Sequence, residues 1–386
     1  MGRGREMRHY SDGGRASVAR RPGPPFDMVA PRQDIRFCTS ADGTRIAYAT
    51  AGRGAPLVKA ANWLSHLEFD CESPVWVHWV RELSRDHTLV RYDERGCGLS
   101  DWEAEQSFEA WLTDLDAVVA AAGVDRFPLL GLSQGASIAI AYAVRHPERV
   151  THLVLMGGFA RGRARRGMTA AQLEEAAMMR RLAEIGWGQE NPAFRQFFTS
   201  QFIPSGNVEQ HRWFNELARV STSPASAARL MGVSDQIDVT DLLPRVQCPT
   251  LVLHAARDAR VPFDEGRRLA ALIPGARFLA LDSANHVLLE VEPAWPVFVE
   301  AFYDFVGAGE ATPQATPGGA GATPLTGAEA AVLELLARGL DNHAIARQLG
   351  KSEKTVRNQV STIFDKLGVR TRAEAIVYAI GGRAPR

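Results

Sequence analysis

The chain has 386 residues, which is too long for one ordinary domain and long enough for a large core with a small appendage. Hydrophobic residues make up 46% and charged residues 23%, a globular composition that excludes a disordered or fibrous chain. The formal net charge is zero, so the whole chain does not coat nucleic acid. The charge is uneven, however, because residues 324–386 hold 10 Lys and Arg against 6 Asp and Glu. This end can meet phosphates locally.

The cysteines and the apolar runs indicate the compartment. Four cysteines lie far apart with no C-x-x-C pair, namely Cys38, Cys71, Cys97 and Cys248. We expect free thiols and neither a zinc site nor a disulfide framework. No apolar run approaches the roughly 18 residues that span a bilayer, and no hydrophobic signal core follows the Arg- and Gly-rich start. The sequence therefore predicts a cytoplasmic protein with no membrane association, metal or other cofactor.

Two segments lack apolar periodicity. Residues 1–33 are rich in Gly, Arg and Pro and cannot bury enough surface to order themselves, so we expect a disordered extension. A basic DNA-binding arm is the alternative there, and Met28 is a second candidate start. Residues 307–323 are small residues with Pro and Gly, typical of a flexible linker. Two folded parts are expected, residues 34–306 and 324–382.

Short β-rich runs alternate with helical patterns between residues 35 and 305. This alternation is typical of parallel strands joined by crossover helices. The predicted strands are 35–40, 45–50, 56–60, 87–92, 127–132, 152–156, 250–254 and 277–281. The sequence thus predicts an α/β fold with a large central sheet.

A G-x-S-x-G motif, Gly131 to Gly135, follows the fifth of these strands and precedes a helical pattern at 136–145. Small residues on both sides of Ser133 permit a strained strand-to-helix turn that pushes the hydroxyl outward. The start of the following helix favours developing negative charge. The motif therefore predicts Ser133 as a nucleophile.

A nucleophilic serine needs a base to take its proton and an acid to orient that base. Asp258 follows the strand at 250–254, and His286 follows the strand at 277–281. Their surroundings, LVLHAARDARVP and LALDSANHVLLEVEP, resemble the acid and histidine loops of α/β-hydrolases. The resemblance implies an α/β-hydrolase fold and a catalytic triad of Ser133, Asp258 and His286, in the chain order of that family.

The sequence departs from this family at the loop after the third strand. Hydrolases of this kind carry His-Gly there, followed by a residue whose backbone N–H faces the oxyanion; here Ala61-Asn62-Trp63 stands in register. By the resemblance, the backbone N–H groups of Trp63 and Gln134 form the oxyanion hole. The missing glycine leaves two alternatives, a pocket that hydrolyses its ligand and a pocket that only binds it.

Residues 160–243 interrupt the strand alternation with helical patterns, where the family inserts a cap over its active site. Many flexible or aromatic side chains fall in or beside this segment: Met156, Met168, Met178, Met179, Met231, Trp187, Phe197, Phe198, Phe202, Trp213 and Phe214. Such side chains make an adaptable apolar wall. We expect most of them to pack in the core and some to line a pocket for a small, largely apolar ligand.

The C-terminal part predicts a helix-turn-helix. Thr326 and Glu329 form a T-x-x-E capping box that starts a first helix. A second short helix is expected at 342–349 and a third from Ser352 to about residue 367. This segment resembles the LuxR-type DNA-binding domain over nearly its full length, LTGAEAAVLELLARGLDNHAIARQLGKSEKTVRNQVSTIFDKLGVRTRAEAIVYAI.

The resemblance implies that the third helix enters the major groove of double-stranded DNA. Its expected contact residues are Lys354, Thr355, Arg357, Asn358 and Ser361. Arg357 and Asn358 suit guanine and adenine edges, whereas Lys354 and Thr355 suit phosphates. One such domain makes few contacts, so we expect a homodimer on paired half-sites, with a last helix at 372–380 in its interface.

Two functions fit this combination. The first is a DNA-binding transcriptional regulator whose α/β-hydrolase-like domain binds a small apolar ester or lactone, with or without hydrolysis. The alternative is an active serine esterase or lactonase with an accessory DNA-binding tail. Under the alternative, Ser133→Ala abolishes turnover and leaves DNA binding intact.

Overall fold

The computed structural model describes residues 31–307 and, in the C-terminal part, residues 325–338, 340, 342–367, 375 and 379. The expected N-terminal extension lies outside the described residues apart from 31–33, and the expected linker apart from Gly307. Of the expected last helix, only residues 375 and 379 are described.

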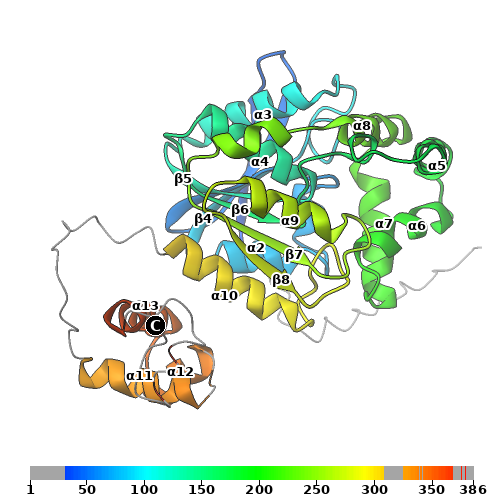
Figure 1. Ribbon diagram of the computed structural model, residues 1–386. Coiled ribbons are helices and arrows are strands. Elements are labelled where there is room, and N and C mark those ends of the chain that lie inside the picture. Colours follow the sequence, from blue (N-terminus) through cyan, green and yellow to red (C-terminus); the bar gives the residue numbers. More distant parts are fainter. Residues whose placement is uncertain are drawn as a thin grey trace, which may run out of the picture.

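An eight-stranded sheet forms the centre of the large described part (Figure 1). Its order is β1-β2-β4-β3-β5-β6-β7-β8. The pairs β1/β2 and β2/β4 are antiparallel, and every later pair is parallel. The strands are β1 Gln33–Thr39, β2 Arg45–Gly52, β3 Ala55–Lys59, β4 His87–Tyr92, β5 Phe127–Leu132, β6 Val150–Met156, β7 Thr250–Ala255 and β8 Arg277–Leu281. All eight predicted strands are confirmed, with ends that differ by at most two residues.

Helices cover both faces of the sheet, which is why its central strands are apolar throughout. Helices α2 and α10 lie together on one face, where Trp79 and Trp295 have ring centroids 4.8 Å apart, and α3, α4 and α9 lie on the other (Figure 1). The helices on the two faces, together with the short helix α1, are α1 Leu67–Asp70, α2 Val77–Leu83, α3 Phe108–Ala122, α4 Gln134–Arg145, α9 Phe263–Leu272 and α10 Ala294–Gly307. Across the described ranges, no helix is both long and apolar enough to cross a membrane.

The predicted cap is a group of helices at one side of the sheet, drawn in green in Figure 1. Local signals start them: Thr169 and Asn207 each form a capping box, and Pro224 stands in the first turn of the last helix. The elements are η1 Arg163–Arg165, α5 Ala170–Gly186, α6 Ala193–Phe202, α7 Val208–Ser221, α8 Pro224–Gln236 and η2 Thr240–Arg245.

The small C-terminal part holds three described helices, α11 Gly327–Ala337, α12 Asn342–Leu349 and α13 Glu353–Leu367. The predicted capping box is confirmed, since Thr326 and Glu329 exchange side-chain to backbone hydrogen bonds. Lys366 also pairs with Glu329 at 2.7 Å, which ties α13 to the start of α11. The helices share a separate apolar core that includes Val332, Leu336, Ile345, Val356 and Ile363. This is a small all-helical domain of the helix-turn-helix type.

Candidate active site and nucleic-acid interface

Ser133 sits in a strained turn between β5 and α4. Its φ of +55° makes it the one residue other than glycine with positive φ in the described ranges. Both glycines of the motif are required by space: a Cβ on Gly131 would lie 2.6 Å from the Cα of Ala136, and one on Gly135 would lie 2.6 Å from the carbonyl oxygen of Ala61. The motif therefore holds Ser133 at the N-terminus of α4, where helix N–H groups are unpaired.

Asp258 follows β7 and is fixed from two directions. Its Oδ1 accepts hydrogen bonds from the backbone N–H groups of Arg260 (2.8 Å) and Val261 (2.9 Å). Its Oδ2 accepts from Nδ1 of His286 at 2.7 Å. Burial acts to raise the pKa of Asp258, but the attraction and hydrogen bond of His286 outweigh it, and the pKa lies below its ordinary value. The carboxylate is therefore ionised and orients the imidazole.

His286 is held by the cap as well as by the acid. Its backbone N–H donates to the carbonyl of Phe202 at the end of α6, at 2.8 Å, and the two rings meet edge to face at 5.4 Å. Its Nε2 is buried and has no hydrogen-bond partner among the described residues. This nitrogen is free to accept a proton. The Phe202 carbonyl thus joins the cap to the histidine loop.

Gly157, directly after β6, is a site residue that sequence reasoning missed. A Cβ at this position would lie 3.1 Å from Cε1 and 3.2 Å from Nδ1 of His286, and 3.6 Å from Oδ2 of Asp258. Its φ of +57° also favours glycine. The signal in the sequence was a Gly-Gly pair after the strand that precedes the cap.

The loop after β3 brings Trp63 to the wall of the same pocket as Ser133 and Gln134. No hydrogen bond to the backbone N–H of Trp63 is formed within the described residues, and that of Gln134 stands in the first turn of α4, where helix N–H groups lack partners. The half-buried side chain of Lys59 donates to Asn62 and so braces the loop. Burial lowers the pKa of Lys59 to about 8.

The side chain of Gln134 donates to the carboxyl of Glu94, which follows β4. Glu94 is buried, and its other oxygen has no hydrogen-bond partner among the described residues. Burial raises the pKa of Glu94 to about 8, against the lowering effect of the hydrogen bond from Gln134. An acidic side chain thus anchors the residue expected to supply one oxyanion donor.

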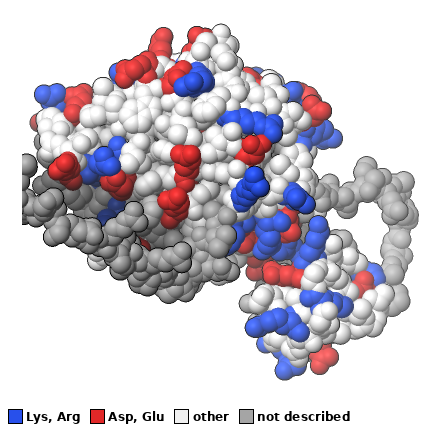
Figure 2. Space-filling model, turned by 180° about the vertical axis from the view of Figure 1, so that it is seen from behind, with Lys and Arg blue, Asp and Glu red and all other residues white. Residues whose placement is uncertain are grey.

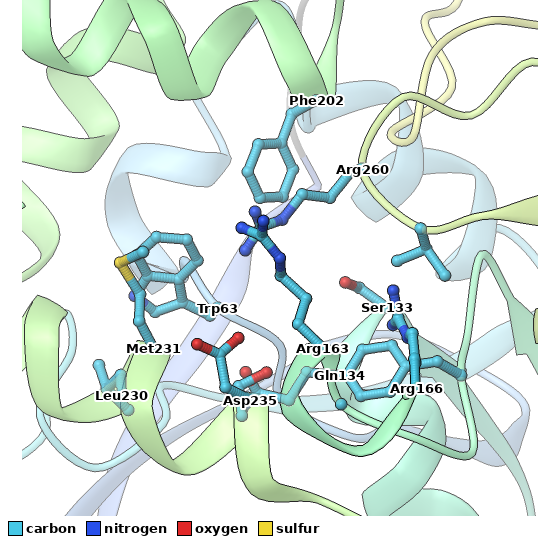
Figure 3. Close-up of a pocket in the computed structure, with 14 residues that line it drawn as sticks. Trp63, Ser133, Gln134, Arg163, Arg166, Phe202, Leu230, Met231, Asp235 and Arg260 are labelled. Carbon is cyan, nitrogen blue, oxygen red and sulfur yellow. The ribbon is translucent and has the colours of Figure 1, made fainter. Parts of the chain in front are cut away.

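A pocket lies between Ser133 and the cap. The sequence predicted a largely apolar wall, and the structure corrects this to a mixed one. Apolar side chains line part of it, including Phe159, Phe202, Leu230 and Met231. Three arginines line the rest, namely Arg163, Arg166 and Arg260 (Figure 3). The sequence reasoning weighed methionines and aromatic residues and overlooked the Arg-rich run at 161–166.

Helix α13 presents most of the residues expected to contact DNA. Four of them are exposed, namely Lys354, Thr355, Asn358 and Ser361, while Val356, Val360 and Ile363 are buried against the domain's core. In Figure 2 several Lys and Arg side chains lie over the small domain and beside it where it approaches the large one. This exposed polar helix face, with Lys354 as its cation, is suited to a phosphate-lined groove.

Arg357 is placed differently from its neighbours on α13. Its side chain is only 14% exposed, because the guanidinium lies 4.5 Å from the ring centre of Tyr303 in α10 and 3.6 Å from a carboxylate oxygen of Asp86. The residue best suited to a guanine edge therefore contacts the hydrolase domain in this structure.

The chain matches two family models. The α/β hydrolase fold matches residues 70–293, more than half of the chain, and bacterial regulatory proteins of the luxR family match residues 323–379. The chain belongs to the α/β hydrolase fold family, and it carries a C-terminal DNA-binding domain of the luxR type.

Individual relatives are more distant. A pyrrolizixenacetamide deacetylase from Xenorhabdus hominickii is 25% identical over 266 residues, covering 67% of this chain and 94% of that protein. A 2-hydroxy-6-oxo-2,4-heptadienoate hydrolase from Pseudomonas putida is 26% identical over 235 residues, covering 55% of this chain and 77% of that protein. The crystal structure of an esterase from Rhodococcus sp. ECU1013 has a TM-score of 0.57 and 26% identity, covering 71% of this chain and 99% of that one.

Proposed function

We propose that the protein is a transcriptional regulator whose hydrolase domain binds and hydrolyses a small ester or lactone, and that this binding controls its affinity for DNA. The observation that carries the proposal is the Asp258–His286 pair, whose Nε2 has no partner among the described residues; Phe202, which contacts the His286 ring, also lines the pocket of the strained Ser133. The similarity to proteins named as a deacetylase, a hydrolase and an esterase supports acyl cleavage.

In the first half of the proposed reaction, Oγ of Ser133 bonds to the carbonyl carbon of the substrate while Nε2 of His286 takes the hydroxyl proton. The backbone N–H groups of Trp63 and Gln134 stabilise the negative charge on the carbonyl oxygen. His286 then gives its proton to the leaving alcohol oxygen. An acyl-enzyme remains; with a lactone, the released alcohol stays attached to the acyl chain.

In the second half, His286 takes a proton from water as the water oxygen attacks the acyl carbon. The bond to Ser133 breaks, Oγ regains the proton from His286, and the carboxylic acid leaves. Asp258 stays ionised throughout and holds the imidazole in the required tautomer.

Binding under the cap is proposed to act on the DNA-binding domain by shifting an equilibrium of a homodimer between two states. The cap contacts the histidine loop through the Phe202 carbonyl, so a ligand that moves the cap also moves the site. The change in DNA affinity can be no larger than the ligand's differential affinity for the two states. Hydrolysis makes such a signal self-limiting.

The test uses a fluorophosphonate probe on the full-length protein and on Ser133→Ala. Labelling that requires Ser133 supports an activated nucleophile, and no labelling would refute hydrolysis. DNA affinity is then measured with Ser133→Ala and a panel of esters and lactones, which this variant binds without destroying. If no member of the panel alters DNA affinity while the native chain turns esters over, the protein is a hydrolase with an accessory DNA-binding tail.

A further inference from the structure

Three arginines share the pocket of Ser133, and they come from two different parts of the fold. Arg163 and Arg166 stand at the entry to the cap, and Arg260 stands on the loop that carries Asp258. Figure 3 shows the guanidinium groups of Arg163 and Arg260 converging on one region of the pocket, toward which the Ser133 hydroxyl also points. Positively charged side chains from the entry to the cap and from the Asp258 loop therefore lie beside the nucleophile.

These charges are poorly compensated by the protein. Arg166 donates to the backbone carbonyl of Arg161 (2.7 Å) and Arg260 to the side-chain oxygen of Gln201 (3.2 Å); within the described ranges neither forms an ion pair. Among the described residues, the one ion pair of Arg163 is with the exposed carboxylate of Glu175, at 3.6 Å.

The acidic residue of the pocket wall balances them only in part. Asp235 lines the pocket, but its carboxylate is paired with Arg180 at 2.8 Å. By contrast, the buried Arg95 forms an ion pair with Asp114 at 2.6 Å, and the buried Arg91 one with Asp70 at 2.9 Å. Burying a charge is costly unless it is paired, so guanidinium groups that are only partly compensated in a pocket favour an anionic occupant.

The electrostatics of Arg260 agree with this geometry. Burial lowers its pKa to about 10; among the nearby charges, the attraction of Asp235 acts against this lowering, and the repulsion of Arg163 and Arg166 acts with it. The pKa of Arg166 is also lowered, chiefly by burial. A negative group placed between these side chains would relieve their repulsion.

We infer that the substrate is an ester or lactone that also carries a free carboxylate, which Arg163 and Arg260 bind while the acyl carbon faces Ser133. The planar guanidinium fork matches the two oxygens of a carboxylate, which gives orientation as well as affinity. The inference rests on the proposed function, since it names the substrate class of the same site. It replaces the neutral apolar ligand that the sequence alone predicted.

Binding is tested first, with full-length Ser133→Ala and calorimetry. The probes are monomethyl glutarate, which has one free carboxylate, and dimethyl glutarate, which has none. We expect the monoester to bind at least about tenfold more tightly, because a hydrogen bond to a charged group contributes about 1.5–3 kcal/mol. Equal binding of the two esters, or binding of neither, would overturn the inference. Tighter binding of a phosphonate analogue would overturn the assignment of a carboxylate.

Variants then locate the anion. Arg163→Gln and Arg260→Gln, each added to Ser133→Ala, should weaken monoester binding about tenfold or more, with much less effect on the diester. Arg260→Lys keeps the positive charge but loses the planar guanidinium fork. Its affinity for the monoester should therefore lie between those of the parent and of Arg260→Gln. Two matched controls should bind like the parent: Arg257→Gln, on the same loop but paired with Asp282, and Arg165→Gln, on the same short helix but outside the pocket wall. Thermal melting of each variant establishes that it is folded.

Turnover separates this inference from the proposed function. In the native chain, the ratio of kcat/KM for the 4-nitrophenyl monoester of glutaric acid to that for 4-nitrophenyl hexanoate should exceed one and drop about tenfold in Arg260→Gln. If Ser133 proves unreactive while the monoester still binds selectively, hydrolysis fails and the anion site stands. If both esters are cleaved equally well and Arg260→Gln leaves the ratio unchanged, hydrolysis stands and the anion site fails.

Discussion

The backbone N–H of Arg260 donates to Oδ1 of Asp258 at 2.8 Å, so one turn after β7 fixes both the proposed catalytic acid and a pocket arginine. One residue, Ala259, lies between the carboxylate that orients His286 and an arginine that lines the pocket. The Arg260 side of the proposed anion site is therefore tied to the triad geometry by the backbone, whereas Arg163 reaches the site from the entry to the cap.

Replacing Asp258 by Asn should remove the charge that orients His286 and should favour the wrong imidazole tautomer. We expect kcat to fall by about 10⁴-fold, with DNA binding unchanged. Ester hydrolysis and fluorophosphonate labelling measure this. Asp282→Asn is the control, since its side chain is 86% exposed and paired only with Arg257. Retention of more than about a tenth of the turnover in Asp258→Asn would contradict the assigned role.

Gly157→Ala should push the imidazole of His286, because the new Cβ would lie 3.1 Å from Cε1 at a backbone φ of +57°. We expect a loss of about 1–2 kcal/mol in the free energy of unfolding and a fall in kcat/KM of at least about tenfold. Gly275→Ala is a matched control: its φ is +68°, but no atom lies within 4 Å of the added Cβ. It should lose similar stability and keep its activity. Equal activity losses in both variants would show that the effect on Gly157 is strain alone.

Glu94 should make stability fall with rising pH. Burial raises its pKa from 4.5 to about 8 in the folded state, so its contribution is fully present below about pH 4.5 and is lost as pH rises toward 8. The slope in this window can reach about 1.4 kcal/mol per pH unit. Glu94→Gln lacks this titration and should gain stability over the native chain between pH 5 and pH 8, as urea unfolding would measure. Glu105→Gln, at an exposed position, serves as the control. If the free energy of unfolding depends on pH in the same way in the native and Glu94→Gln proteins, the effect is excluded.

Arg357 cannot contact a base edge while it lies against Tyr303 and Asp86. Weakening that contact should therefore favour DNA binding: Asp86→Asn should raise DNA affinity about threefold to tenfold, because such a half-buried contact contributes about 1 kcal/mol. The measurement uses a duplex enriched by the native protein from a random pool. Arg357→Ala should instead weaken binding about tenfold or more. The exposed Asp125→Asn should have no effect, and an unchanged affinity in Asp86→Asn would mean that this contact does not restrain the helix.

Local sequence patterns were sufficient to predict the helices and strands and the order of the proposed catalytic residues along the chain. The strands were predicted because buried parallel strands are short apolar runs, and the turn at Ser133 because only glycine fits at Gly131 and Gly135. The luxR-type domain was predictable for a similar reason, since its capping box at Thr326 and its helical periodicity are local. The contact of Arg357 with Tyr303 had no such signal, because it joins two domains.

By itself, the sequence determined the α/β-hydrolase fold, the luxR-type domain and the chain positions of Ser133, Asp258 and His286, since each depends on residues close together in the chain. Only the tertiary structure decided the character of the pocket. Arg163 and Arg260 lie almost one hundred positions apart and meet because the cap folds back over the loop after β7. The balance of charge in a cavity depends on which side chains face it and which are paired elsewhere, and neither property is encoded in a local pattern.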